Sequence, residues 1–111
     1  MNVTCREDSR HRLSSVFAEG HVELPETSSD EFSLVCAAVS GILQAARLGL
    51  EAHVKVPLDA TQSSGTLSLR WPSSCREDER VQAIVDTARL ANVQIALQYP
   101  SHVTCHEEKE A

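Results

Sequence analysis

Aromatic side chains are scarce in this sequence, at 4% of 111 residues. Val, Leu, Ile and Ala must therefore build the core, and the hydrophobic content of 41% is sufficient for that. Basic residues are also few, because 10 Lys and Arg stand against 16 Asp and Glu, a formal net charge of −6. Nucleic-acid binding needs clustered Lys and Arg that displace counterions, so we expect no direct nucleic-acid partner. An acidic surface suits a basic protein partner instead.

The sequence also has no unbroken apolar run of the roughly 20 residues that a membrane span needs. Its first residues, MNVTCREDSR, lack the apolar centre of a secretory signal. We therefore expect no membrane partner and a cytoplasmic location, where thiols stay reduced. There is no C-x-x-C pair among the four cysteines, which are Cys5, Cys36, Cys75 and Cys105. Neither a zinc knuckle nor a disulfide framework is indicated, and we expect no cofactor and no metal.

The sequence shows no repeat, low-complexity tract or linker, which predicts one domain over residues 1–111. Apolar alternation predicts strands, and apolar residues at helical spacing predict helices. The predicted strands cover 2–6, 13–19, 52–58, 66–71 and 102–105, and the helices follow Ser33 and Ser74. The order β-β-α-β-β-α-β is typical of an α+β fold with two helices packed on a largely antiparallel sheet. We expect 52–58 and 66–71 to form a hairpin and the C-terminal EEKEA to fray.

One segment, 93–99, fits two structures. Its apolar residues alternate as in a strand, and they also continue the helical spacing of the preceding residues. No Gly or Pro interrupts the chain between Arg76 and Tyr99. We therefore predict one long helix that ends before Pro100.

The first helix has two possible starts. Ser28-x-x-Glu31 has the form of a capping box, and Ser33 is a good N-cap by itself. Ser33 is preferred because the helix then carries one apolar face, made of Val35, Val39, Ile42, Ala46 and Leu50. Cys36 and Ser40 follow on the neighbouring face, which predicts a thiol at the border between core and surface. A thiol in the first turn of a helix is favoured as thiolate.

A histidine is available as a base for this thiol. Gly20 and His21 end the second predicted strand, and a histidine from a neighbouring element can accept a thiol proton. From the residues alone both assignments stay open: Cys36 is also a plausible packing residue, and His21 a plausible loop residue.

The Gly-His pair and the start of the first helix together resemble the signature of a known family. Gly20-His21, and Leu34, Val35, Cys36, Ala37 and Ser40 at the helix head, are similar to the signature of the ribosomal-processing cysteine proteases called Prp. The resemblance implies that His21 and Cys36 form a catalytic dyad, that the protein is a homodimer, and that its fold is the one predicted above. It implies a ribosomal protein substrate with an extended N-terminus, namely large-subunit ribosomal protein twenty-seven.

One family position differs. The family's Asp three residues before the cysteine is Ser33 here. If that Asp caps the helix, Ser33 replaces it at a cost of a few tenths of a kcal/mol. If it orients the histidine, Asp30 or Glu31 must do so instead.

Two other classes compete with the protease. An acidic dimeric binding protein without chemistry would grip a basic ribosomal protein tail. A metal site would use His102, Cys105 and His106, but successive strand residues alternate between faces, so these three side chains cannot converge.

Overall fold

The computed structural model describes residues 1–20, 30–63 and 65–110, with the backbone alone for 30–33. Within these ranges the chain forms five strands and two long helices. The elements are β1 (Asn2–Glu7), β2 (Leu13–Glu19), α1 (Asp30–Leu48), η1 (Gly49–His53), β3 (Asp59–Ser63), β4 (Thr66–Arg70), η2 (Ser73–Cys75), α2 (Glu79–Gln98) and β5 (Thr104–Lys109). The predicted α+β order is confirmed.

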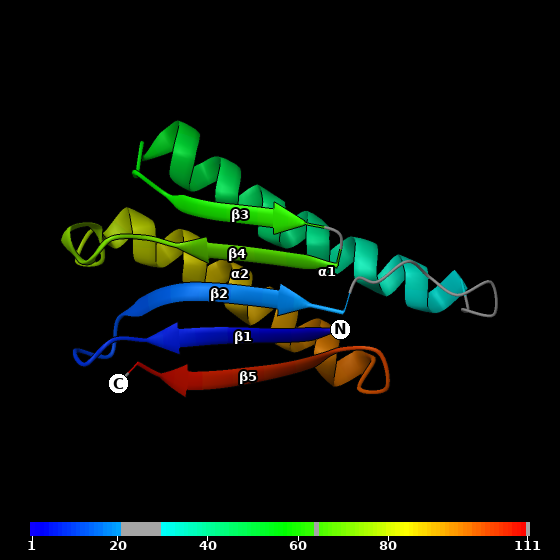
Figure 1. Ribbon diagram of the computed structural model, residues 1–111. Coiled ribbons are helices and arrows are strands. Elements are labelled where there is room, and N and C mark those ends of the chain that lie inside the picture. Colours follow the sequence, from blue (N-terminus) through cyan, green and yellow to red (C-terminus); the bar gives the residue numbers. More distant parts are fainter. Residues whose placement is uncertain (21–29, 64, 111) are drawn as a thin grey trace.

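The strands form one sheet in the order β3-β4-β2-β1-β5, with both helices on the same face (Figure 1). Three of the four strand pairs are antiparallel, and β1 with β5 is parallel. Alternate residues of β1, β2 and β4 are buried under the helices, as a sheet covered on one face requires. The core comprises aliphatic side chains from both layers, including Val3, Val16, Leu69, Val39, Leu43, Leu50, Val81 and Val85. Trp71 joins them, and its indole N–H donates to the Leu13 carbonyl at 2.7 Å.

The predicted strand at 52–58 is wrong. The chain continues from α1 into the π-helical turn η1 and then crosses to β3, which starts at Asp59. Val56 is nevertheless buried, because this connection packs against the core. The hairpin exists, but its first strand starts seven residues later than the predicted one.

The second half of the chain is mostly as predicted. Residues 93–98 are helical, so one long helix is confirmed. Asp78, and not Ser74, caps it, with its side chain accepting from the Arg80 amide. Of the C-terminal residues expected to fray, 107–109 lie in β5 and pair with β1, so the prediction is wrong for them.

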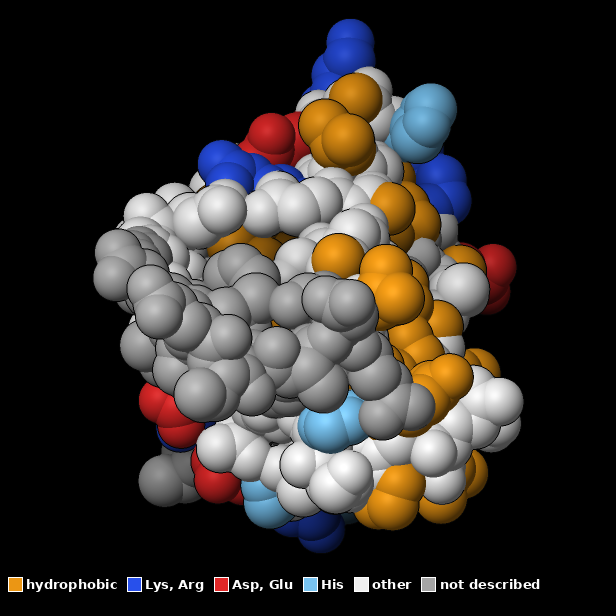
Figure 2. Space-filling view, turned by 90° about the vertical axis from the view of Figure 1, so that its right-hand side faces the viewer, with side chains coloured by type: hydrophobic (Ala, Val, Ile, Leu, Met, Phe, Trp, Pro, Cys, Tyr) orange, Lys and Arg blue, Asp and Glu red, His pale blue; other side chains and the backbone are white. Residues whose placement is uncertain are grey.

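The helical layer has an apolar outer surface. Figure 2 shows hydrophobic side chains gathered on the side of the molecule that the helices form. Leu34, Leu48, Leu90 and Leu97 are all at least half exposed there. The segment Leu34–His53 is long and apolar enough to cross a membrane by composition alone, with a mean hydropathy of 1.4. The expectation that no such segment exists is therefore wrong, although the core helix of a water-exposed domain passes the same test, and here Val39, Leu43 and Leu50 are core residues.

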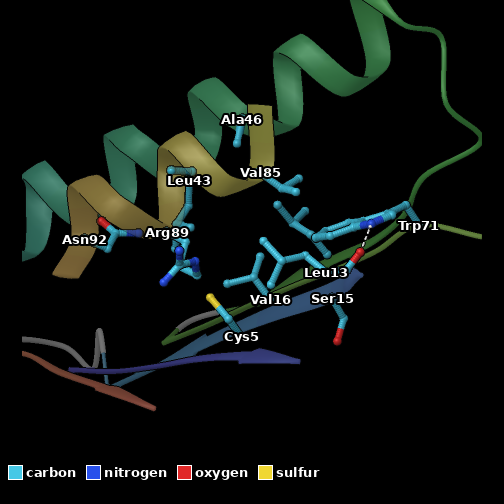
Figure 3. A pocket seen from close by; sticks show the side chains of 12 residues that line it. Cys5, Leu13, Ser15, Val16, Leu43, Ala46, Trp71, Val85, Arg89 and Asn92 are labelled. Atoms are coloured by element: carbon cyan, nitrogen blue, oxygen red, sulfur yellow. Dashed lines mark hydrogen bonds between the residues drawn. The ribbon is translucent and has the colours of Figure 1, made fainter. Parts of the chain in front are cut away.

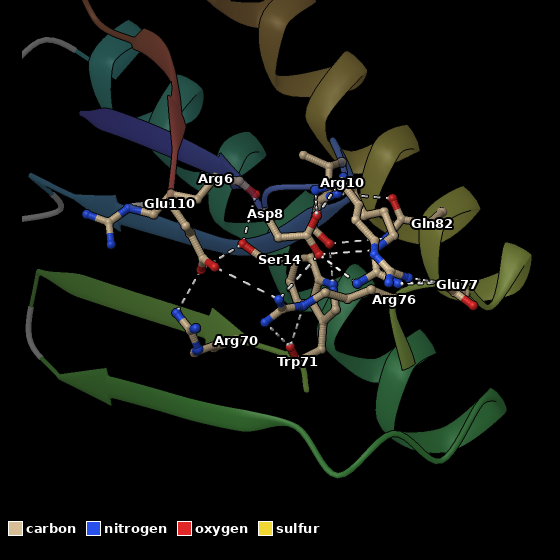
Figure 4. Close-up of polar contacts among 12 residues, drawn as sticks. Arg6, Asp8, Arg10, Ser14, Arg70, Trp71, Arg76, Glu77, Gln82 and Glu110 are labelled. Carbon is tan, nitrogen blue, oxygen red and sulfur yellow. Dashed lines mark hydrogen bonds and ion pairs between the residues drawn. The ribbon is translucent and has the colours of Figure 1, made fainter. Parts of the chain in front are cut away.

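A buried polar network closes the end of the sheet where β1 and β5 finish (Figure 4). Arg76 is only 5% exposed, and its Nε and Nη2 donate to the Trp71 carbonyl at 3.1 and 2.9 Å. Its Nη1 lies 3.5 Å from the Asp8 carboxylate and 3.9 Å from that of Glu110. Glu110 also accepts from the Ser14 hydroxyl at 2.9 Å.

Candidate active site

The opposite end of the sheet, where β1 begins and β2 ends, holds Gly20. Its φ of +100° is one that L side chains rarely adopt. A Cβ at this position would stand 3.1 Å from the Met1 Cα, closer than ordinary contact. The Gly20 amide donates to the Gly65 carbonyl at 3.1 Å, which ties the end of β2 to the β3–β4 turn. Glycine is therefore required here by both conformation and space, and the chain leaves the sheet at a fixed point directly before His21.

Cys36 lies on α1, and the structure changes two predictions about it. The helix begins at Asp30, so Cys36 is its seventh residue and belongs to the second turn. The stabilisation of an anion by the helix dipole fades beyond the first turn. In addition, Cys36 is 0% exposed, and the predicted position at the border of core and surface is wrong. Both Val35 and Leu43 are buried as well, because α1 presses two neighbouring faces into the protein.

The electrostatics of Cys36 follow from this burial. Burial raises the pKa of the Cys36 thiol, and the positive charge of the Met1 ammonium offsets only part of the rise. The ammonium is held in place, because it donates to the His102 carbonyl at 2.8 Å. The resting thiol is therefore protonated at neutral pH, and it needs a base to become a nucleophile.

Ser40, one helical turn after Cys36, is half-buried. It lines a small hollow between α1 and the β3–β4 hairpin, together with Met1, Gln62 and Gly65. Gln44 borders the same hollow and donates to the Gln62 side chain at 2.9 Å. The hollow thus lies beside the helix that carries the thiol.

The structure does not describe the side chains of the two remaining predicted site residues, His21 and Ser33. His21 is not among the described residues, and of Ser33 only the backbone is described, inside α1. Ser33 is therefore not the N-cap, because the helix starts three residues earlier, nearer to the capping-box alternative. Of the candidate site, the structure brings Gly20, Cys36 and Ser40 to the same end of the sheet, around Met1.

Among the described residues, no group of three His, Cys, Asp or Glu side chains is placed to hold a metal ion. A cavity lies between the sheet and the helices (Figure 3), lined by apolar side chains and by Cys5, Arg89 and Asn92. Asn92 is 1% exposed, and neither side-chain polar atom has a hydrogen-bond partner in the described structure. Sequence periodicity had placed no polar residue in this core, and nothing in the pattern marks Asn92.

The fold and this site define a small two-layer α+β protein with a cysteine held on its first helix. A family model described as cysteine protease Prp matches residues 1–104. The chain therefore belongs to the Prp family of cysteine proteases, and the resemblance inferred from the sequence is confirmed.

Solved structures agree on the fold. SMU.848 from Streptococcus mutans superimposes with a TM-score of 0.86 at 22% identity, covering 98% of this chain and 97% of that one. The essential ribosomal processing protease Prp from S. aureus, in complex with a substrate peptide, gives 0.81 at 17% identity, with 96% and 97% covered. The same protein with a covalently linked product peptide gives 0.80 at 18% identity, with the same coverage. No curated protein sequence matches the chain significantly.

Proposed function

We propose that this protein is a cysteine endopeptidase that removes the N-terminal extension of large-subunit ribosomal protein twenty-seven. The observation that carries the proposal is the family match over residues 1–104, which spans both His21 and Cys36. The S. aureus relative, a ribosomal processing protease, binds a substrate peptide and carries a covalently linked product peptide. That chemistry supports a covalent route in this chain, with Cys36 as nucleophile and His21 as base.

Acylation of Cys36 requires base catalysis here. Because burial raises the pKa of the thiol, little thiolate exists before substrate binds. In the proposed step His21 takes the thiol proton while the sulfur bonds to the scissile carbonyl carbon. The tetrahedral intermediate collapses, the C–N bond breaks, and His21 returns the proton to the leaving amine. Water, deprotonated by His21, then attacks the thioester and frees the N-terminal fragment and the thiol.

The oxyanion needs donors that the helix does not use internally. The Cys36 amide lies in the second turn, where an N–H bonds the carbonyl four residues earlier. In the described part of the helix, the free amides belong to its first three residues, 30–32. The Cα–Cβ bond of a helical residue tilts toward the helix N-terminus, so the Cys36 side chain leans toward that first turn. We therefore assign the oxyanion to first-turn amides, with that of Phe32 the nearest along the axis.

Access to the sulfur is the second requirement. A thiol with no exposed surface cannot be attacked or acylated until neighbouring atoms move. Substrate binding must therefore displace what covers Cys36, and the resting enzyme is protected from adventitious oxidation and alkylation.

Cleavage of a synthetic peptide tests the proposal. The peptide spans the extension and the first mature residues of ribosomal protein twenty-seven from the same cell. Cys36→Ser and His21→Ala should each lower the cleavage rate by about a thousandfold or more and leave the fold intact. Cys75→Ser is the matched control, since that cysteine lies in η2, and it should cleave at the wild-type rate. Cleavage by Cys36→Ser at the wild-type rate would eliminate the assignment.

The competing class, an acidic dimeric binding protein without chemistry, is not favoured by the family match. Homodimerisation and a cytoplasmic location remain part of the proposal. Analytical ultracentrifugation at micromolar concentration should give twice the mass of the 12.1 kDa chain. A monomer throughout that range would remove the dimer from the account.

A further inference from the structure

The strand at one edge of the sheet, β3, is open to solvent along its length. In the described part of the chain, β4 is the only strand that pairs with it. Four of its five residues are exposed, and its sequence, DATQS, contains neither Lys, Arg nor Pro. Protein edges that must not pair with other chains usually carry such residues. The other edge is different, because β5 places Glu107, Glu108 and Lys109 along its length.

The free groups of this edge are specific backbone donors and acceptors. Ser63 and Thr66 face each other across the two-residue turn, so they form a hydrogen-bonded pair in the hairpin. Backbone groups alternate in direction along a strand, which turns the N–H and C=O of Ala60 and Gln62 away from β4. An antiparallel partner makes up to four hydrogen bonds with these two residues. Only an extended peptide backbone presents the matching pattern.

The same edge leads to the candidate active site. Figure 1 shows the C-terminal end of β3 at the end of the sheet where β1 begins and where the first half of α1 lies. Gln62 is bonded to Gln44 of α1, and both border the hollow that Ser40 lines. Cys36 lies eight residues before Gln44, about 12 Å along the helix axis. An extended chain covers that span in about four residues.

We propose that the free edge of β3 binds the substrate as an added sixth strand, through the outward backbone groups of Ala60 and Gln62, and delivers the scissile bond to Cys36. The inference rests on the proposed protease function. Recognition through the backbone fixes the path of the peptide, and side-chain preferences arise from the hollow beside it. The scissile bond then lies about four residues from the peptide residue opposite Gln62.

Ala60→Pro tests the inference. Proline deletes the outward N–H and leaves the ladder to β4 unchanged, since Ala60 bonds away from that strand, and edge strands accept proline. Loss of one peptide hydrogen bond should raise KM for the ribosomal peptide about three- to tenfold, with a smaller effect on kcat. Thr61→Ala is the control. The Thr61 backbone groups point to β4, so this substitution removes no backbone hydrogen bond to the bound peptide. Urea unfolding confirms that both variants are folded.

Methylated peptides give a second, independent readout. A series of peptides, each N-methylated at one residue, is tested for binding to the Cys36→Ser variant. Methylation should weaken binding only at every second residue, because alternate peptide amides face the edge of β3. In the same complex, the Ala60 and Gln62 amides should be protected from hydrogen exchange.

The outcomes separate this inference from the protease proposal. Normal cleavage with an unchanged KM in Ala60→Pro overturns the edge-strand inference and leaves the protease standing. Binding with protected amides but no cleavage supports the edge strand and removes the protease. If the peptide neither binds nor is cleaved, both fail. If Ala60→Pro changes only the monomer–dimer equilibrium, the edge pairs with a second copy, and the inference is overturned.

Discussion

Arg76 and Arg80 lie four residues apart, one before and one after the start of α2, and the structure predicts very different costs for losing them. Replacing each with Met keeps much of the aliphatic stem and removes the guanidinium. Arg76 donates twice to the Trp71 carbonyl, at 3.1 and 2.9 Å, from a position that is 5% exposed. Arg80 pairs with Asp78 at 2.7 Å, but its side chain is 68% exposed.

The magnitudes follow from burial rather than from contact length. Hydrogen bonds from a charged donor contribute about 1.5–3 kcal/mol each, and a buried acceptor left without a partner adds a penalty. Arg12 still pairs with Asp8 at 3.0 Å when Arg76 is lost, which limits the damage to that carboxylate. Arg76→Met should therefore lower the free energy of unfolding by about 2–4 kcal/mol. Arg80→Met should cost less than about 1 kcal/mol, as exposed ion pairs do.

Urea unfolding at pH 7, followed by far-UV circular dichroism, measures both variants under the same conditions. The denaturant dependence of the free energy should be unchanged, so that the midpoints report stability alone. If Arg80→Met costs as much as Arg76→Met, burial does not decide the strength of these contacts and the description of the network is wrong.

Three other outcomes are expected. Iodoacetamide at pH 7 should modify Cys75, which is partly exposed, on the order of tenfold faster than the buried Cys36 in the resting protein, by peptide mass spectrometry; faster reaction at Cys36 contradicts the buried site. Burial acts to raise the pKa of Asp8, but hydrogen bonds from Arg12 and Arg10 outweigh it and lower the pKa to about 2. The Asp8 carboxylate therefore stabilises the fold above about pH 4, and this contribution is lost as the pH falls toward 2. In Asp8→Asn the urea midpoint of unfolding should change less with pH over that window than it does in the wild type. Asn92→Leu should raise the free energy of unfolding by about 1–3 kcal/mol, since it removes two buried groups without partners; a lower urea midpoint would show that Asn92 is bonded in solution.

Apolar pattern located the elements that have one buried face. β2 was predicted with its observed bounds, because Leu13, Val16 and Ala18 point into the core. The long helix through residues 93–98 was predicted from the absence of a breaker, which outweighed the alternation in the same segment.

The same method failed where neither face of a strand is buried. β3 and the end of β5 lie at the two edges of the sheet and are mostly exposed, so no alternation marks them. The alternating residues Val54, Val56 and Leu58 instead belong to an irregular connection that packs on the core. Edge strands follow from pairing with β1 and β4, and pairing is a long-range property that local pattern does not contain.

The site was only partly accessible to sequence reasoning. The resemblance pointed to Gly20 and Cys36 as candidate site residues, and the positive φ and close approach of Met1 explain the glycine. The helical spacing of the apolar residues placed Cys36 at the border of the buried face. That inference assumes that only one narrow face of the helix is buried. Here α1 buries two neighbouring faces, so the thiol is enclosed and its pKa raised.

The most direct test of the account locates the acyl group during turnover. Wild-type protein is mixed with the ribosomal peptide, quenched in acid within the first turnover, digested and examined by mass spectrometry. We expect the N-terminal fragment of the substrate to be attached as a thioester to Cys36, and we expect no such adduct in His21→Ala. An acyl group on any other residue, or cleavage that proceeds unchanged in Cys36→Ser, would contradict it.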